Sequence, residues 1–263
     1  MGVTFLKRGS DSVKLQEQEK AQQELRKASF GRLWRWFLKE GEEGKLTFVD
    51  GQLDSQGFLV PPRVYEHTVM HNGKWTNFVC PEKSDPSLGF KCPICAGGDQ
   101  PSLVSFFTVI DHRVFVSKKD GKTVTNTRKL LVAKPQSMEM LAKMAIKRDG
   151  LAGCTFDVSR NGNKSPNIGN VFDFTEKRSI EECQKLYVEQ IQDEKTKKIE
   201  TRSLFVPADY DNEIECLTPE ELIMLGFGNS GVTHMHQPNH ASLGSPPVGS
   251  TVQDTGQNYE ELF

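Results

Sequence analysis

The chain has 263 residues, with 36% hydrophobic and 26% charged side chains, six cysteines and a formal net charge of −2. Its length allows one core of about 150–200 residues with arms to spare. No apolar run reaches the roughly 18 residues of a membrane-spanning helix, and the first residues lack the apolar stretch of a signal peptide, so we expect a cytoplasmic protein without membrane contact. Irregularly spaced cysteines in such a protein favour a metal site or buried thiols over a disulfide framework.

Residues 1–28 form a predicted N-terminal arm. It opens with the basic run Phe5-Leu6-Lys7-Arg8, and residues 12–28 continue as a polar stretch with helical character. Its apolar positions make only a thin stripe, so such a helix needs a partner to be stable in water.

Short strands dominate residues 29–227, which we expect to form the core. Runs rich in β-branched and aromatic residues, separated by Gly, Pro or Asp, occupy residues 33–38, 45–49, 64–70, 74–80, 102–110, 112–117, 127–133, 154–159 and 169–175. Helices are expected over 137–147 with Ser137 as the cap, from Ser179 with an apolar period reaching Ile191, and from Thr218 to about Gly226. This mainly β pattern with a few helices favours a small β-barrel, such as the oligonucleotide-binding (OB) barrel.

The strongest local signal is a cluster of metal-ligand residues. Cys92-Pro93-Ile94-Cys95 is a C-x-x-C turn, and Cys80 stands twelve residues before it. Two sulfurs on one tight turn fill one edge of the tetrahedron that a structural Zn²⁺ requires. Four protein ligands would close the coordination shell, so we expect one structural zinc ion within a subdomain at about 64–98.

Hairpin geometry selects the fourth ligand. Asn72-Gly73 between two apolar runs is a strong signal for a two-residue hairpin loop. That loop places His67 and Cys80 as diagonal neighbours on one face, with Cβ atoms about 7 Å apart or less. His71 would lie about 20 Å away along the strands at ~3.3 Å per residue, so His67 is the predicted ligand. A three-residue loop would shift the register and leave His71 as the alternative.

The spacing His67-x12-Cys80-x11-Cys92-x2-Cys95, with Asn72-Gly73-Lys74-Trp75 inside it, resembles the zinc subdomain of the T-even bacteriophage single-stranded-DNA-binding (helix-destabilising) proteins. The resemblance implies an OB barrel with an inserted zinc ribbon. It also implies a flexible basic N-terminal arm for cooperative self-association along DNA, here Lys7 and Arg8, and a C-terminal tail that contacts phage replication and recombination proteins. Ser105-Phe106-Phe107 falls where that family has an aromatic pair beside its DNA cleft.

The segment after the cluster carries the residue types that bind single strands. Residues 113–148 contain ten basic and two acidic residues, against the net negative charge of the whole chain. Non-specific binding of single strands needs cations for phosphates and exposed rings for base stacking. Adjacent Phe106 and Phe107 point to opposite faces of a regular strand, so at most one of them is expected in the core. The predicted DNA-binding residues are Phe106, Phe107, Arg113, Phe115, Lys118, Lys119, Lys122, Arg128 and Lys129.

Residues 228–263 are rich in Gly, Ser, Pro, Asn, Gln and His, and we expect them to be a disordered tail. The tail ends in an acidic and aromatic tip that resembles the tip of bacterial single-strand-binding proteins. Such a tip on a flexible tether suits a basic groove on a partner. The predicted partner-binding residues are Tyr259, Glu260, Glu261, Leu262 and Phe263.

Two other functions remain open from the sequence. One is a zinc-ribbon nuclease or hydrolase, for which Asp111-His112 beside the basic segment is the best candidate pair. The other is a zinc-ribbon regulator that reads duplex DNA. The chain contains no G-x-S-x-G, P-loop or H-E-x-x-H motif, which disfavours an enzyme.

Overall fold

The computed structural model of the chain describes residues 33–116, 121, 123–192 and 199–228. The predicted arm with Lys7 and Arg8 and most of the predicted tail lie outside these residues. So do three predicted DNA-binding lysines and the tail tip, namely Lys118, Lys119, Lys122, Tyr259, Glu260, Glu261, Leu262 and Phe263.

The described part is mainly β, as expected, and is organised around one antiparallel sheet of seven strands. Within it the order is β3-β2-β4-β1-β8-β9, and β7 branches from this path by pairing with residues 105–111 of β4. The strands are β1 (Glu43–Phe48), β2 (Arg63–His71), β3 (Lys74–Val79), β4 (Ser102–Asp111), β7 (Thr127–Ala133), β8 (Cys154–Ser159) and β9 (Val171–Lys177). Two short two-stranded sheets flank it, formed by β5 (Phe115–Val116) with β6 (Thr123–Val124) and by β10 (Val188–Gln192) with β11 (Ile199–Ser203).

Residues 33–38 connect the two ends of the curved part of this sheet. The Trp36 N–H donates to the carbonyl of Leu130 on β7, 2.7 Å away, and the Leu38 N–H donates to the carbonyl of Asn167, 2.7 Å away in the β8–β9 loop. Trp36 and Leu38 are buried, because alternate residues of this extended segment face inward. The segment thereby closes the curved part of the sheet around the main core, and we call this part of the molecule the barrel.

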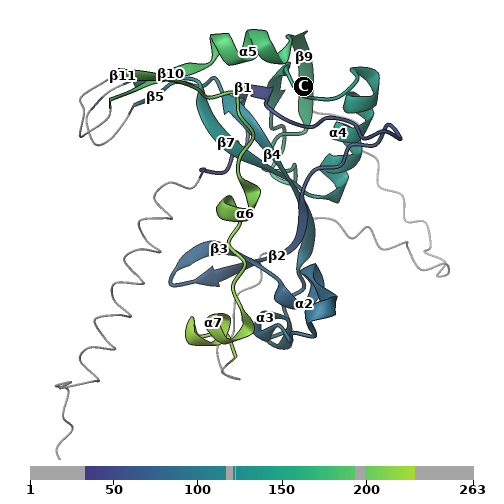
Figure 1. Cartoon of the computed structure of the whole chain (residues 1–263). Helices are drawn as coiled ribbons and strands as arrows, with labels where there is room; N and C mark the ends of the chain where they lie inside the picture. Colours follow the sequence, from purple (N-terminus) through teal and green to yellow (C-terminus); the bar gives the residue numbers. More distant parts are fainter. Residues whose placement is uncertain (1–32, 117–120, 122, 193–198, 229–263) are drawn as a thin grey trace, which may run out of the picture.

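The main core lies inside this closed sheet in the upper part of the molecule (Figure 1). Phe48 sits at its centre, with its ring edge-on to Phe107 and Phe156 at centroid distances of 5.7 and 5.8 Å. Helix α4 (Pro135–Lys147) adds Met138, Leu141 and Ala145 to the core.

The helix boundaries differ in part from those expected. α4 begins two residues earlier than predicted, with Lys134 as N-cap and Pro135 in the first turn, so Ser137 is a buried helical residue and not the cap. The capping boxes at Ser179 and Thr218 are both confirmed. α5 (Ile180–Leu186) ends before Ile191, because the chain pairs as β10 with β11 from Val188 onward.

The outer face of β4 is covered by the chain that follows β11. Phe205 packs against Ile110 in a second core cluster. Further along, the Thr108 hydroxyl bonds to the Ala208 N–H at 2.8 Å and to the Tyr210 hydroxyl at 2.9 Å. We call residues 204–228 the strap; it includes α6 (Tyr210–Glu213) and α7 (Pro219–Met224).

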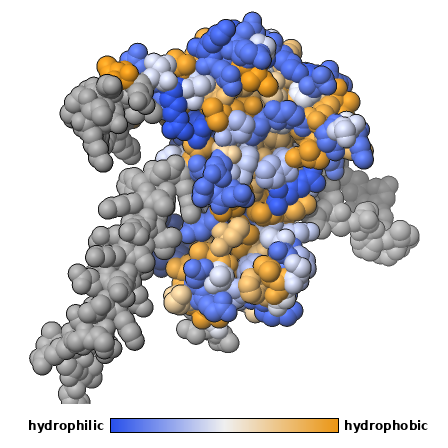
Figure 2. Space-filling view, in the orientation of Figure 1, coloured by the Kyte–Doolittle hydropathy of each residue, from blue (hydrophilic) through white to orange (hydrophobic). Residues whose placement is uncertain are grey.

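Below the barrel, β2 and β3 extend into a smaller lobe that also contains α2 (Pro81–Ser84), the 3-10 turn η1 (Pro86–Leu88), α3 (Pro93–Ala96) and α7 (Figure 1). Leu222 and Phe227 of the strap are buried there against Val69 and Phe78. Figure 2 shows hydrophobic residues on the surface of this lobe, where α7 exposes Ile223 and Met224. The strap therefore contributes to the packing of both barrel and lobe.

Candidate functional site

The β2–β3 hairpin has the two-residue loop that the sequence predicts. Asn72 and Gly73 both have positive φ, 50° and 73°, as a turn matching the twist of a hairpin requires. His71 pairs with Lys74, and His67 pairs with Phe78. Beyond the end of the ladder, the Cys80 N–H donates to the Tyr65 carbonyl at 2.7 Å. The predicted register is therefore confirmed, and it brings His67 and Cys80 to one face.

The cysteines sit on two short turns of similar build. Cys80 and Cys92 each precede a proline and each serve as the N-cap of a one-turn helix. Their carbonyls accept hydrogen bonds from the backbone N–H groups of Ser84 and Ala96, both at 3.0 Å. The Glu82 carboxylate accepts the Cys92 N–H at 2.9 Å and so ties one turn to the other.

The four predicted ligands converge on one point. The ligand atoms of His67, Cys80, Cys92 and Cys95 all lie within 4.8 Å of one another. His67 Nε2 is 3.4 Å from Cys92 Sγ and 3.5 Å from Cys95 Sγ, while Cys80 Sγ is 3.6 Å from Cys95 Sγ. Metal–ligand bonds of ~2.0–2.3 Å in a tetrahedron give ligand–ligand edges of about 3.5–3.8 Å, so these residues fit one tetrahedral ion. All three thiols are free of disulfides, and the first three ligands are buried.

A carboxylate that the sequence analysis missed orients the histidine. His67 Nδ1 lies 2.6 Å from Asp99 Oδ2, and both side chains are buried. With its proton on Nδ1, facing Asp99, the imidazole has a free lone pair on Nε2 that is directed at the sulfurs. This is the usual carboxylate–histidine–metal arrangement. Asp99 lies only four residues after Cys95. This short spacing from a predicted ligand was the signal that could have identified it.

Burial disfavours the charged forms of the histidine and of two of the cysteines, and a bound cation would reverse this effect for the thiols. Burial lowers the pKa of His67, which keeps the imidazole neutral and able to act as a ligand. Burial also raises the pKa of Cys92 and that of Cys95, since thiolates without a cation are unfavourable in this setting. A bound metal ion supplies the charge that stabilises the thiolates. The cluster can therefore hold a metal ion.

His71, the alternative ligand, has a different role. Its Nε2–H donates to the Leu225 carbonyl at 3.0 Å, and its ring lies 5.7 Å from Phe78 and 5.3 Å from Phe227. It therefore joins the hairpin to the end of the strap and lies outside the ligand cluster.

The predicted aromatic pair does not form an exposed surface. Phe106 and Phe107 are 1% and 0% exposed, so the expectation that at most one of them is core is wrong. Phe107 enters the barrel core, while Phe106 lies on the outer face of β4, where the Arg35 guanidinium is 6.0 Å from the ring centre. Both faces of β4 are covered, so neither ring offers a face to a base in this conformation.

The described basic residues fall on two sides of β7. Lys129 Nζ lies 5.0 Å from the Phe115 ring, and Arg113 lies 5.5 Å from the same ring. Arg128, the next residue along the strand, points to the opposite face and donates to the Val206 carbonyl at 3.3 Å. The structure thus brings Arg113, Phe115 and Lys129 together and separates Arg128 from them.

The guanidinium of Arg113 is fixed by hydrogen bonds to other groups of the protein. Its Nε and Nη2 donate to the buried Asp111 carboxylate at 3.0 and 2.9 Å, and its Nη1 donates to the Phe37 carbonyl at 3.2 Å. The guanidinium also lies 4.2 Å from the Trp36 ring. These bonds leave at most about two of its five N–H donors for a phosphate, so its main effect is to fix the surrounding aromatic residues.

Two exposed rings that the sequence analysis did not select lie beside this group. Trp34 is 80% exposed and Phe37 is 47% exposed, on the segment that closes the barrel next to β7. The Leu130 N–H donates to the Trp34 carbonyl at 2.9 Å, which places Trp34 next to Lys129 in the sheet. Alternation places Phe37 opposite the buried Trp36, whereas Trp34 shares the face of Trp36 and is exposed because it lies at the start of the described segment, beyond the main core. We call Trp34, Phe37, Phe115 and Lys129 the aromatic strip.

The candidate catalytic pair does not form a dyad. Asp111 is bonded to Arg113, whereas His112 Nε2 lies 2.8 Å from the Thr47 hydroxyl and His112 Nδ1 lies 2.7 Å from the Asn126 side-chain oxygen. Burial lowers the pKa of His112. This histidine is thus a neutral member of a polar network inside the protein.

Comparisons with known proteins give no relatives for this chain. No family model, no curated protein and no solved structure matches it. Among the helices of the described residues, none has the length and apolar character needed to cross a membrane.

Proposed function

We propose that the chain binds single-stranded DNA without sequence preference, as a non-enzymatic OB-type barrel with a zinc-ribbon lobe. In this proposal it coats and protects exposed strands during phage DNA replication, recombination and repair. Self-association along DNA would use the basic arm, and the tail tip would recruit replication and recombination proteins.

The observation that carries the proposal is the aromatic strip on the barrel surface. Trp34 is 80% exposed although it is the kind of residue that normally loses most of its surface on folding. Phe37 lies on the same segment, Phe115 lies on β5, and Lys129 has its Nζ 5.0 Å from the Phe115 ring and is next to Trp34 in the sheet. Exposed rings interleaved with a cation suit successive bases and their phosphates, whatever the sequence of the strand.

The second support is the chemistry of the metal cluster, which we assign to one Zn²⁺. Three sulfurs and one imidazole nitrogen at tetrahedral spacing are the donor set of structural zinc sites. Four protein ligands leave no position for water or substrate, so the ion would stabilise the lobe and take no part in hydrolysis. The ligands would be His67, Cys80, Cys92 and Cys95.

Arg35 provides a connection between the lobe and the strip. Its guanidinium makes a bidentate ion pair with Glu66 at 2.8 and 2.5 Å, next to the ligand His67. Arg35 is also the residue that follows Trp34. The rigid lobe would therefore help to hold the Trp34 segment in the orientation that stacking requires.

A fluorescence titration with poly(dT) and with duplex DNA of equal length, each at two salt concentrations, tests the proposal. We expect tight binding to the single strand alone. If four to six cations contact phosphates, the logarithm of the affinity should fall with the logarithm of salt concentration with a slope between about −3 and −4. Those cations would include Lys129 and the lysines at 118, 119 and 122.

Equal binding to both forms, or absence of binding, would refute the proposal. Metal-dependent cleavage of a labelled single strand in the same samples would instead support the nuclease alternative. Preference for one duplex sequence would support the regulator.

A further inference from the structure

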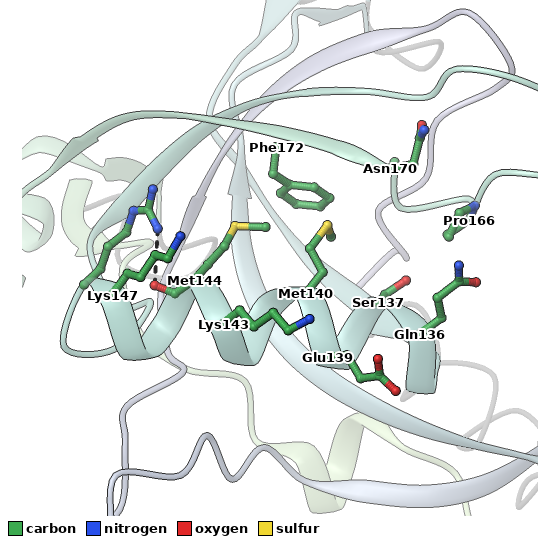
Figure 3. Close-up of a pocket in the computed structure, with 12 residues that line it drawn as sticks. Gln136, Ser137, Glu139, Met140, Lys143, Met144, Lys147, Pro166, Asn170 and Phe172 are labelled. Atoms are coloured by element: carbon green, nitrogen blue, oxygen red, sulfur yellow. Dashed lines mark hydrogen bonds between the residues drawn. The ribbon is translucent and has the colours of Figure 1, made fainter.

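The pocket beside α4 and the outer edge of β3 have no role in the function proposed above. The pocket has a volume of about 470 Å³, and Figure 3 shows it between α4 and Phe172. Lys143 lies one helical turn from both Glu139 and Lys147, so acidic and basic side chains alternate along the helix and select no ligand charge. The edge of β3 is different, because its unpaired backbone groups specify the chemistry of an occupant.

The register of the lobe hairpin leaves one edge of β3 unpaired. The Cys80 N–H donates to the Tyr65 carbonyl on β2, so Phe78 and every second residue before it also direct their backbone groups toward β2. Trp75 and Asn77 alternate with these residues and direct their N–H and C=O groups away from β2. Within the described residues, β3 pairs with no strand on that side, and the side chains of Trp75 and Asn77 are exposed.

The edge of β3 also lacks the charges that usually protect an edge strand. β9, at the opposite end of the sheet order, has three charged residues among seven, and charges disfavour the addition of another strand. β3 has a single charged residue among six, Lys74, at the turn end. Native proteins protect an uncharged edge by covering it with another segment of the chain. The β3 edge is therefore suited to a covering segment.

The described chain ends beside this edge. Phe227 packs on the hairpin, with its ring centre 5.0 Å from that of Phe78 on β3, and Gly228 follows as the last described residue. Neighbouring strands lie about 4.8 Å apart, and the three residues 229–231 can span about 10 Å. The segment that begins at Val232 is therefore within reach of the β3 edge.

The sequence after Gly228 has the composition of a turn followed by a short strand. Asn229-Ser230-Gly231 consists of turn residues. Residues 232–237 are the longest stretch of 229–263 without Gly, Pro, Ser, Asn or Asp, and they begin with the β-branched Val232 and Thr233. Pro238 has no backbone N–H and would end the pairing. Residues 229–253 include no charged side chain, which matches the uncharged edge.

We propose that residues 232–236 pair with β3 as the third strand of the lobe hairpin. The ligand class of this edge is an extended, uncharged peptide held by main-chain hydrogen bonds to Trp75 and Asn77. The tail tip would then be tethered to the lobe by residues 237–258, which span at most about 75 Å, against about 100 Å for residues 229–258. The pairing would thus limit how far from the lobe the tip can meet a partner. This inference does not depend on DNA binding.

Amide hydrogen exchange in the full-length protein tests the pairing. The Trp75 and Asn77 amides should be protected in the wild type, because strand addition would bond both N–H groups. Thr233→Pro combined with His234→Pro removes a donor on each side of the added strand, so the variant blocks pairing in either register. In this variant we expect the two edge amides to exchange at least about tenfold faster, because they would become open to solvent.

Two controls separate this effect from a general loss of structure. The Thr76 and Phe78 amides point toward β2, so they should keep their protection in the variant and report that the hairpin is folded. Ala241→Pro combined with Ser242→Pro places two prolines farther along the tail. This control variant should leave the edge amides protected.

Three results would overturn the proposal. The first is edge amides that exchange in the wild type as fast as unprotected amides do. The second is protection that persists in the Thr233→Pro, His234→Pro variant. The third is wild-type protection that is lost on dilution, since that would place the segment of a second copy on the edge.

Discussion

The barrel and the metal lobe are stabilised in different ways. Among the described residues, seventeen buried side chains form the barrel core, whereas the core of the lobe has seven, two of which are Cys80 and Cys92. A lobe of this size buries too little apolar surface to offset the entropy of folding. We therefore expect the barrel to depend on packing alone, and the lobe to depend on a bound metal ion and on the strap.

The strap is where the two regions meet. Its first part seals the outer face of β4 through Phe205 and Tyr210, and its last part places Leu222 and Phe227 in the lobe core. A substitution that destabilises the barrel or the lobe should therefore show whether the strap transmits the loss of stability to the other region.

Removal of the metal should have the largest effect and should be confined to the lobe. Structural zinc contributes about 10–16 kcal/mol in small zinc peptides, far more than the few apolar contacts of this lobe. After chelation, we expect amide hydrogen-exchange protection to be lost over β2 and β3 beyond Tyr65 and kept in β7. Elemental analysis should give one zinc per chain for the wild type and none for Cys80→Ser.

Cys216→Ser is the control for this experiment, because Cys216 is exposed and lies outside the cluster. It should retain the metal. A lobe that stays protected without metal would show that packing alone stabilises it.

Truncation of Phe48 should have the largest effect on the barrel. Phe48 is 0% exposed and contacts two other core rings, so Phe48→Ala should lower the free energy of unfolding by about 3–5 kcal/mol. Urea denaturation followed by circular dichroism measures this change. Phe58→Ala, at a ring that is 60% exposed, should cost less than about 0.5 kcal/mol.

Asp50 should make the attachment of the strap to the barrel depend on pH. Burial raises the pKa of Asp50 from 3.8 to about 6, even though Tyr210 donates to it at 2.5 Å. A folded-state pKa above the unfolded value means that the folded protein binds more protons between about pH 4 and 6. Stability is therefore greatest below this window and is lost as the pH rises through 6, by at most about 3 kcal/mol.

Urea midpoints of the wild type and of Asp50→Asn between pH 4 and 7 measure this contribution. The difference between the two proteins should vary with pH, and Asp173→Asn, at an exposed carboxylate, should show no such variation. Parallel curves for wild type and Asp50→Asn would exclude a role for this carboxyl group.

Loss of the Trp34 ring should have the smallest effect on stability and a specific effect on DNA binding. Trp34→Ala should weaken binding to poly(dT) by about 1–3 kcal/mol, because a stacked ring contributes that much per base. Because the ring is 80% exposed, the free energy of unfolding should change by less than about 0.5 kcal/mol. The readout is the fluorescence titration described above, with a labelled strand.

Trp75→Ala is the matched control, because Trp75 is 44% exposed on the lobe hairpin. It should leave affinity unchanged. Equal losses for both variants would place the DNA on the lobe as well as on the barrel.

Local sequence signals predicted the features that depend on neighbouring residues. The Asn72-Gly73 turn sets the hairpin register, and the register together with the C-x-x-C turn brings His67 and the three cysteines together. The capping boxes at Ser179 and Thr218 were predicted for the same reason, since each one involves residues only three positions apart.

Features that depend on distant segments were not predictable in this way. Alternation along β4 gives the two faces that Phe106 and Phe107 occupy, but it carries no information about what covers each face. The outer face is covered by segments that are distant in the chain, since Arg35 lies over Phe106 and the strap covers Thr108 and Ile110, so Phe106 is buried as well as Phe107. The same limit applies to Arg128, which the β7 strand turns away from Lys129 and toward the strap.

The sequence by itself therefore determined the mainly β class, the hairpin and the cluster of His67 with three cysteines, because each follows from short-range spacing and backbone preference. Only the tertiary structure decided which rings are exposed, which cations share a surface and where the strap attaches. Those properties depend on which distant segment packs on a given face, and that is settled by the burial of the whole core.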